Sequence, residues 1–200
     1  MTWEAVVGEE WHTLPNAKNP CPPPTPEFNC VLPFTRNVVG SMDYTPVVFS
    51  IPAKKTTNAH ELALVVIFES AWQCIADSPE SYAVSPGRPL LKEVPATWDD
   101  IHFIDGHPDE FVCLARLKGN DWYVAAINAG VARTLTIPLT FLKQGTYAVT
   151  LYKDDAQAKD SATRTADKIA VENITLGTTK PFEIAIPANG GFCMKIANSF

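Results

Sequence analysis

Residues 30–49 have the sequence CVLPFTRNVVGSMDYTPVVF, and this stretch decides how the chain is interpreted. It opens with an apolar run at 31–34, becomes polar at 35–37 and turns at Gly40. A buried strand that ends in a polar loop has this pattern. Because loops at strand ends carry the functional residues of barrels and open α/β folds, Arg36 and Asp43 become candidates. The alternative is an Arg36–Asp43 ion pair that only pins the loop.

The amino-acid composition argues against several classes of protein. The chain has 200 residues, of which 46% are hydrophobic, enough for one large or two small domains. The net charge of −6 argues against a nucleic-acid surface. No run of 18 apolar residues occurs, so no membrane span is expected, and residues 1–4 do not begin a signal peptide.

The five cysteines are widely spaced and form no C-x-x-C motif, which argues against zinc or thioredoxin-type chemistry. Cys74, Cys113 and Cys193 lie in apolar runs and are expected in the core. Cys21 and Cys30 flank a Pro-rich segment. They could form a disulfide in an oxidising compartment, but sequence alone does not decide this.

Three carboxylates lie close together near the start of the chain, at Glu4, Glu9 and Glu10. Clustered carboxylates repel one another unless a proton or a cation intervenes. Ca²⁺ takes several oxygen ligands, so a calcium site is one interpretation. A solvated acidic loop is the other.

Residues 58–76 are expected to form a helix, with Asn58 as N-cap and Glu61 three residues later. Apolar side chains occupy nearly all sides of this segment, which is typical of a buried helix. His60 in its first turn is interpreted as a packed or capping residue. Earlier in the chain, residues 11–28 are Pro-rich and are expected to form a long loop.

From residue 101 onward the pattern changes to short alternating strands separated by turn residues. An antiparallel β-sandwich is therefore predicted. Four aromatic residues could contact sugar, although such residues more often pack in cores or across strands: Trp98, Trp122, Tyr123 and Tyr152. The predicted strands are residues 101–104, 111–117, 122–128, 132–139, 146–153, 169–176, 182–186 and 192–196.

Several segments together resemble glycoside hydrolase family 97. Residues 32–46, LPFTRNVVGSMDYTP, resemble the end of that family's catalytic barrel, as do HELALVVIFE at 60–69 and ADSPESY at 76–82. Residues 115–123, 141–147 and 189–192 resemble its C-terminal β-domain. Such enzymes are α-glucosidases and α-galactosidases, largely periplasmic.

The resemblance implies an α+β fold: the C-terminal part of a (β/α)₈ barrel at 1–95, then an antiparallel β-sandwich at 96–200. In the family a Glu-Gly-x-x-Gly-x-Glu segment binds Ca²⁺, and its second glutamate is the general acid. The matching residues are Glu4 and Glu10, with Ala5 in place of the usual glycine. The resemblance thus implies Glu10 as acid and Glu4 with Glu10 as calcium ligands.

An oligosaccharide substrate, a periplasmic location and a need for the earlier barrel strands also follow from this resemblance. The second required carboxylate should lie on those strands, so this chain alone is not expected to be active. The alternatives are a non-catalytic carbohydrate-binding or structural β-module and, on the three glutamates alone, a calcium-binding adhesion module. The all-round apolar helix argues against the first alternative, because a helix that only adapts a module should be amphipathic.

Overall fold

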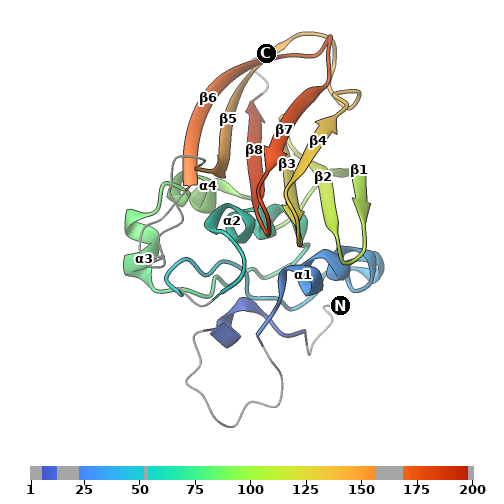
Figure 1. The fold of residues 1–200 in the computed structure, drawn as a ribbon. Helices are drawn as coiled ribbons and strands as arrows, with labels where there is room; N and C mark the ends of the chain where they lie inside the picture. The colour runs from blue at the N-terminus through green and yellow to red at the C-terminus, as the bar shows by residue number, and fades with distance from the viewer. Residues whose placement is uncertain (1–5, 13–22, 52–53, 156–168, 198–200) are drawn as a thin grey trace.

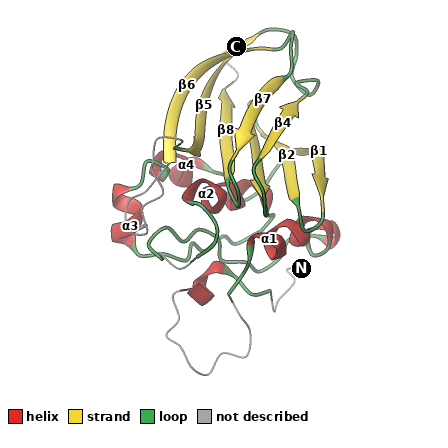
Figure 2. Ribbon diagram, viewed as in Figure 1, coloured by secondary structure: helices red, strands yellow, loops and turns green. Residues whose placement is uncertain are grey.

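The computed structural model describes residues 6–12, 23–51, 54–155 and 169–197. Helices and loops form one part of the molecule, and the strands rise from it (Figures 1 and 2). None of the described helices is long and apolar enough to cross a membrane. The helical elements are η1 (Glu9–His12), α1 (Pro26–Val31), η2 (Leu32–Phe34), η3 (Asn37–Val39), α2 (Asn58–Ile67), α3 (Pro79–Val84) and α4 (Arg88–Glu93).

The strands form an antiparallel sheet of six, in the order β1-β2-β3-β8-β5-β6, and a second sheet of two, β4-β7. All the strands predicted from residue 101 onward are confirmed, and their ends differ by a few residues at most. Their bounds are β1 (Asp100–His107), β2 (Phe111–Lys118), β3 (Asp121–Asn128), β4 (Arg133–Ile137), β5 (Thr146–Asp154), β6 (Ile169–Gly177), β7 (Phe182–Ile186) and β8 (Gly191–Ala197).

The hairpin between β2 and β3 shows how local sequence sets this pairing. Lys118 pairs with Asp121, so the loop is two residues long. Gly119 has φ +59, the left-handed geometry that two-residue hairpin turns require at this position. The residues Lys-Gly-Asn-Asp at 118–121, a sequence typical of a hairpin, therefore form one of the turns expected between the strands.

The six-stranded sheet is covered on both faces, which explains why β2 is buried along most of its length. Cys113 and Ala115 face the core shared with β4 and β7. Val112 and Leu114 face a second core that includes the side chains of α2. The predicted sandwich is confirmed, and its outer face also carries the helical part of the chain. The division at residues 95 and 96 stays a prediction.

The strand predicted at residues 31–34 is wrong, because this segment is helical. Thr25 caps α1 by accepting a hydrogen bond from the Phe28 amide at 3.2 Å. Pro26 stands in the first turn, where its missing N–H costs nothing. The chain then continues from α1 directly into η2, so the Pro-rich loop ends earlier than expected.

Helix α2 is buried on all sides as predicted, but it is shorter than expected. Thr57, and not Asn58, is its N-cap and accepts a hydrogen bond from the His60 amide. The helix ends at Ile67 because Asn37 engages the backbone of Glu69. The Asn37 side chain accepts from the Glu69 amide at 3.1 Å and donates to its carbonyl at 3.0 Å. A tertiary contact therefore sets this end.

Candidate functional site

The turn η1 carries Glu10 and is hydrogen-bonded to Thr45, near the end of the sequence motif at 32–46. The Glu9 amide donates to the Thr45 carbonyl at 2.8 Å, and the Trp11 amide donates to the Gly8 carbonyl at 3.2 Å. A Cβ at Gly8 would overlap Glu10 Oε2 and lie 2.9 Å from the Thr45 nitrogen. Glycine is therefore required where the Glu10 carboxyl folds back over the chain.

Glu10 is half-buried beside the same turn. Burial raises the pKa of its carboxyl, and the charges of Glu9 and Asp43 add to this. Hydrogen bonds from the backbone and from the Thr45 side chain act in the opposite direction. A carboxyl with a raised pKa holds its proton closer to neutral pH, as a general acid must.

Glu9 points the other way, into the core. Its side chain is fully buried, and its Oε1 accepts hydrogen bonds from two side chains. The Tyr44 hydroxyl lies 2.8 Å away and Asn29 Nδ2 lies 3.0 Å away. Such charge-assisted hydrogen bonds are what a buried carboxylate needs.

Asn29 extends this network to helix α2. Its Nδ2 also lies 3.3 Å from His60 Nε2, and its Oδ1 lies 3.0 Å from the Tyr44 hydroxyl. Burial lowers the pKa of His60 to about 4, so the ring is neutral near pH 7 and Nε2 can accept. Burial and the Glu9 charge raise the pKa of Tyr44 well above its usual value, which keeps its hydroxyl a donor. The packed interpretation of His60 is confirmed.

A second buried carboxyl follows His60 on α2. Glu61 accepts from the Val48 amide at 3.1 Å and from the Thr56 hydroxyl. Burial and the Glu9 charge raise the pKa of Glu61 to about 8. The expected capping role of Glu61 is therefore wrong, because its carboxyl holds the loop before α2.

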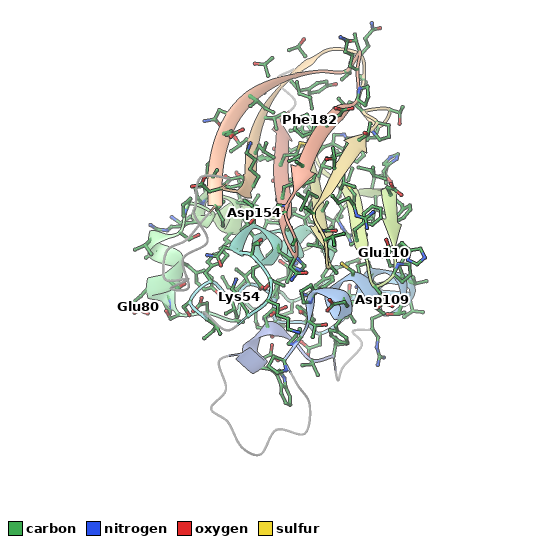
Figure 3. The ribbon with its side chains drawn as sticks, in the orientation of Figure 1. Lys54, Glu80, Asp109, Glu110, Asp154 and Phe182 are labelled. Carbon is green, nitrogen blue, oxygen red and sulfur yellow. The ribbon has the colours of Figure 1, made fainter. Side chains whose placement is uncertain are left out.

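The start of α2 also meets the sandwich. Lys54 Nζ donates to the Thr56 carbonyl at 3.0 Å and to Asn58 Oδ1 at 2.8 Å. Asp154, at the end of β5, accepts from the Gly191 amide at 3.0 Å. Figure 3 labels Lys54 and Asp154, which lie near the start of α2. Burial raises the pKa of Asp154 to about 6, although the charge of Lys54 opposes this.

The remaining candidates from the sequence are less connected. Arg36 is exposed at the start of η3, and no ion pair joins it to Asp43 among the described side chains. Tyr123 and Tyr152 are buried in the core, so their packing interpretation is confirmed. Trp98 packs on Tyr123 with ring centroids 5.3 Å apart.

The metal hypothesis depends on a residue that the structure leaves out. Glu4 lies outside the described residues, so its distance to Glu10 is not defined. The described residues contain no group of three or more His, Cys, Asp or Glu side chains that could hold a metal ion. Of the two expected ligands, the structure therefore places only Glu10.

The possible disulfide between Cys21 and Cys30 also involves a residue that the structure does not describe. Cys21 lies outside the described residues. Cys30 is buried, with its Sγ 4.0 Å from the Ile127 carbonyl oxygen, and burial raises the pKa of its thiol to about 12.

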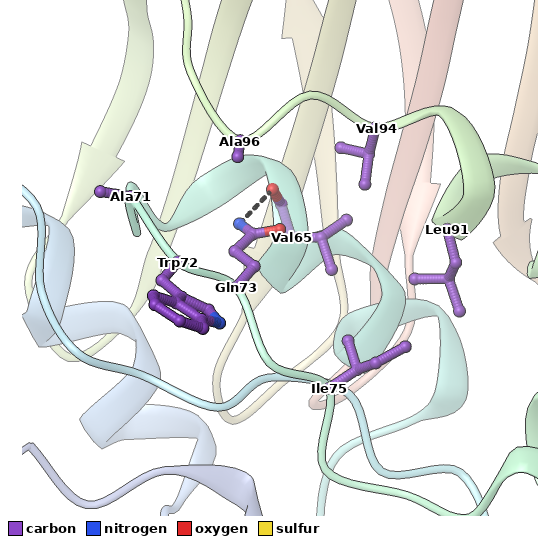
Figure 4. A pocket seen from close by; sticks show the side chains of 8 residues that line it. All are labelled: Val65, Ala71, Trp72, Gln73, Ile75, Leu91, Val94 and Ala96. Carbon is purple, nitrogen blue, oxygen red and sulfur yellow. Dashed lines mark hydrogen bonds between the residues drawn. The ribbon is translucent and has the colours of Figure 1, made fainter.

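An open hollow of about 340 Å³ lies between α2, the following loop and α4 (Figure 4). Gln73 Nε2 donates to the Val65 carbonyl at 3.0 Å within it. None of the described side chains that line it is ionisable. Its lining residues are Val65, Ala71, Trp72, Gln73, Ile75, Leu91, Val94 and Ala96.

The sequence predicts Glu10 as a site residue but does not predict the residues behind it. In the sequence Glu9 is only a third acidic residue, and no motif singles out Asn29 or Tyr44 for this role. These side chains come from separate segments of the chain. Only the Glu-Glu pair directly before an aromatic residue could have hinted that one carboxyl turns inward.

The sequence and the fold both match known glycosidases. Residues 97–197 match the family model described as "Glycosyl-hydrolase 97 C-terminal, oligomerisation". A probable retaining alpha-galactosidase of Streptomyces bingchenggensis is 40% identical over 157 residues, covering 77% of this chain and 23% of the relative. The retaining alpha-galactosidase of Bacteroides thetaiotaomicron is 30% identical over 183 residues, covering 85% of this chain and 27% of the relative.

Among solved structures, a glycoside hydrolase family 97 enzyme from Pseudoalteromonas sp. strain K8, in complex with acarbose, matches with a TM-score of 0.82. It is 29% identical, and the match covers 95% of this chain and 30% of that enzyme. The chain thus spans less than a third of each of these proteins.

Proposed function

Because this chain belongs to glycoside hydrolase family 97, we propose that it is the C-terminal portion of a glycosidase that hydrolyses α-galactosides, with Glu10 as the general acid. Two relatives named as retaining alpha-galactosidases, 40% and 30% identical, support the substrate class. The observation that carries the site is the turn η1, which holds the Glu10 carboxyl half-buried against Gly8 and Thr45.

Hydrolysis of a glycoside needs two carboxyl groups on opposite sides of the scissile bond. Glu10 donates a proton to the glycosidic oxygen as the bond to the leaving group breaks. In a retaining enzyme, the second carboxylate attacks the anomeric carbon, and Glu10 then deprotonates the incoming water. We place that second carboxylate outside these residues, on barrel strands that precede this segment in the complete enzyme.

The substitution Glu10→Gln in the full-length glycosidase tests this assignment. We expect kcat/KM, which reports the step in which the leaving group departs, to fall by roughly 100-fold or more on galactosides with poor leaving groups, because the leaving oxygen is no longer protonated. Aryl galactosides with acidic phenols should lose far less, since those phenolates leave without a proton. An equal loss on both substrates would refute the acid assignment.

We also propose that Glu4 and Glu10 each contribute an oxygen ligand to one Ca²⁺ ion in the intact enzyme. The support is the family motif together with the preference of Ca²⁺ for carboxylate oxygens. Titration calorimetry of the full-length protein and of Glu4→Ala measures this directly. Unchanged Ca²⁺ affinity in the variant would exclude Glu4.

The complete protein is proposed to contain a (β/α)₈ barrel, to act on oligosaccharides and to be periplasmic, all by family resemblance. Cell fractionation with an antibody against residues 97–197 tests the location. Recovery of the protein in the cytoplasmic fraction would contradict it.

We propose a second copy of the chain as the partner of the sandwich, because the matching family model is described as oligomerisation. Strand β1 is at the edge of its sheet and exposes Ile101 by 50% and Phe103 by 58%. Exposed apolar edge strands favour pairing with another chain. Sedimentation should therefore show a dimer or larger species that Phe103→Lys weakens, and an unchanged mass would argue against β1 as the contact.

A further inference from the structure

We propose that Tyr44 and Asn29 are positioning residues for the general acid, and that they act through the buried carboxylate of Glu9. This inference rests on the proposed role of Glu10. It assigns a task to three buried polar side chains that the chemistry of hydrolysis does not itself use.

The contacts around Glu9 form a specific anchor. Its Oε1 lies 2.8 Å from the Tyr44 hydroxyl and 3.0 Å from Asn29 Nδ2. Glu9 and Asn29 are fully buried, and Tyr44 is 1% exposed. The donors come from α1 and from the loop after η3, so two separate segments converge on one oxygen. Moving this carboxylate would break both of these buried hydrogen bonds.

This anchor controls the direction in which Glu10 points. Successive side chains of a 3₁₀-helix point about 120° apart, so an inward Glu9 directs Glu10 to a different side of the turn. The Glu9 amide also donates to the Thr45 carbonyl at 2.8 Å. Backbone and side chain of Glu9 therefore both resist rotation of the turn, and a rotation is what would move the Glu10 carboxyl away from the bond it protonates.

The anchor contacts helix α2, and the β-sandwich forms hydrogen bonds with both ends of this helix. Asn29 Nδ2 lies 3.3 Å from His60 Nε2 on α2. At the start of α2 the Thr57 amide donates to the Asn189 carbonyl at 3.1 Å. At its end Arg116 Nη2 donates to the Ile67 carbonyl at 3.0 Å. The β-domain thus supports the acid through α2, in addition to any role in oligomerisation.

If Tyr44 and Asn29 only stabilised the fold, their variants would show different kinetics from those expected of positioning residues. Loss of general stability lowers the amount of active enzyme and therefore reduces turnover of all substrates alike. Displacement of the acid lowers kcat/KM only where protonation of the leaving group limits the first step. The ratio of kcat/KM between poor and good leaving groups therefore separates the two roles.

The test is Tyr44→Phe in the full-length glycosidase, with Tyr82→Phe as the matched control. The Tyr82 hydroxyl donates to the Val47 carbonyl at 2.9 Å in the same part of the molecule. For Tyr44→Phe we expect kcat/KM on an alkyl galactoside to fall roughly 10- to 100-fold, since a displacement of about 1 Å can have this effect. With an aryl galactoside kcat/KM should fall by less than about threefold. Tyr82→Phe should affect both substrates equally.

A second variant and a second measurement keep the outcome decisive. Asn29→Asp keeps the shape of the side chain but places a carboxylate against Glu9, so it should show the same split between substrates. Hydrogen exchange of the backbone amides of Glu9 and Trp11 should accelerate in Tyr44→Phe and not in Tyr82→Phe.

Equal losses on both substrates with Tyr44→Phe, or an equal split with Tyr82→Phe, would overturn the inference. Unchanged exchange of the Glu9 and Trp11 amides in Tyr44→Phe would overturn it too. If Glu10→Gln shows no split, the proposed function fails by itself. Accelerated exchange in Tyr44→Phe would then still show that the anchor holds the turn.

Discussion

The two faces of the six-stranded sheet have very different coverings. One face packs against β4 and β7 and contains almost only apolar side chains. The other packs against α2 and the loops before it. On this second side lie most of the buried polar residues that the structure describes, including Glu9, Asn29, Lys54, His60 and Glu61.

This difference separates the face of the sheet that mainly stabilises the fold from the face that holds the candidate site. An apolar core between strands gains free energy from burial alone and needs no polar partners. Buried carboxyls and imidazoles cost free energy unless each one is hydrogen-bonded, and they cluster where proteins tune pKa values. The helix-covered face therefore holds the candidate site, and the strand-covered face supplies the rigid support.

The largest effect is expected from Phe192→Ala, which empties a fully buried position in the strand-covered core. Loss of a buried phenylalanine costs about 3–5 kcal/mol in the free energy of unfolding. Leu62→Ala, at a fully buried position of α2, should cost about 2–5 kcal/mol. Denaturant unfolding of both variants, followed by near-UV and far-UV circular dichroism, compares how much each face contributes to the free energy of unfolding. Separate transitions in either variant would show that the two faces do not unfold together.

A pH-dependent effect is expected where the faces meet, at Asp154. Its pKa in the folded protein is raised from 3.8 to about 6, so the folded state binds this proton more tightly than the unfolded state does. The free energy of unfolding should therefore fall as the pH rises from about 4 to 6, by at most about 3 kcal/mol. Asp154→Asn should remove this slope.

Urea unfolding of the wild type and of Asp154→Asn at several pH values measures the difference. Other groups whose pKa differs between the folded and unfolded states, Glu61 among them, are present in both proteins, so their contributions cancel. Parallel curves would mean that Asp154 titrates normally in the folded state.

A smaller effect is expected from Arg116→Met, at the end of α2. The substitution leaves the Ile67 carbonyl without the donor that lies 3.0 Å away, which costs about 1–3 kcal/mol. Arg133→Met is the control: its ion pair with Glu110, 2.9 Å long, is solvent-exposed and contributes at most about 1 kcal/mol. Thermal unfolding of both variants ranks them, and a larger loss for Arg133→Met would contradict the importance of the helix end.

The same comparison explains what could be predicted from sequence. Alternation and turn residues are local features of the sequence, so they predict the strands of the sandwich and the hairpin at Gly119. The C-terminal end of α2 differs from the prediction because Asn37, far away in sequence, hydrogen-bonds to Glu69. The 31–34 strand was wrong because apolar runs of this length fit helix and strand equally well. The inward turn of Glu9 could not be predicted, because its partners meet it only in the folded chain.

The central claim is that the general acid lies in the helix-covered part while its partner carboxylate lies outside these 200 residues. The most direct test is release of phenol from aryl α-galactoside and α-glucoside by the purified 200-residue chain with Ca²⁺ present. We predict no turnover above the uncatalysed rate, because one of the two required carboxyl groups is missing. Turnover that Glu10→Gln abolishes would contradict this account, since both carboxyl groups would then lie within the chain.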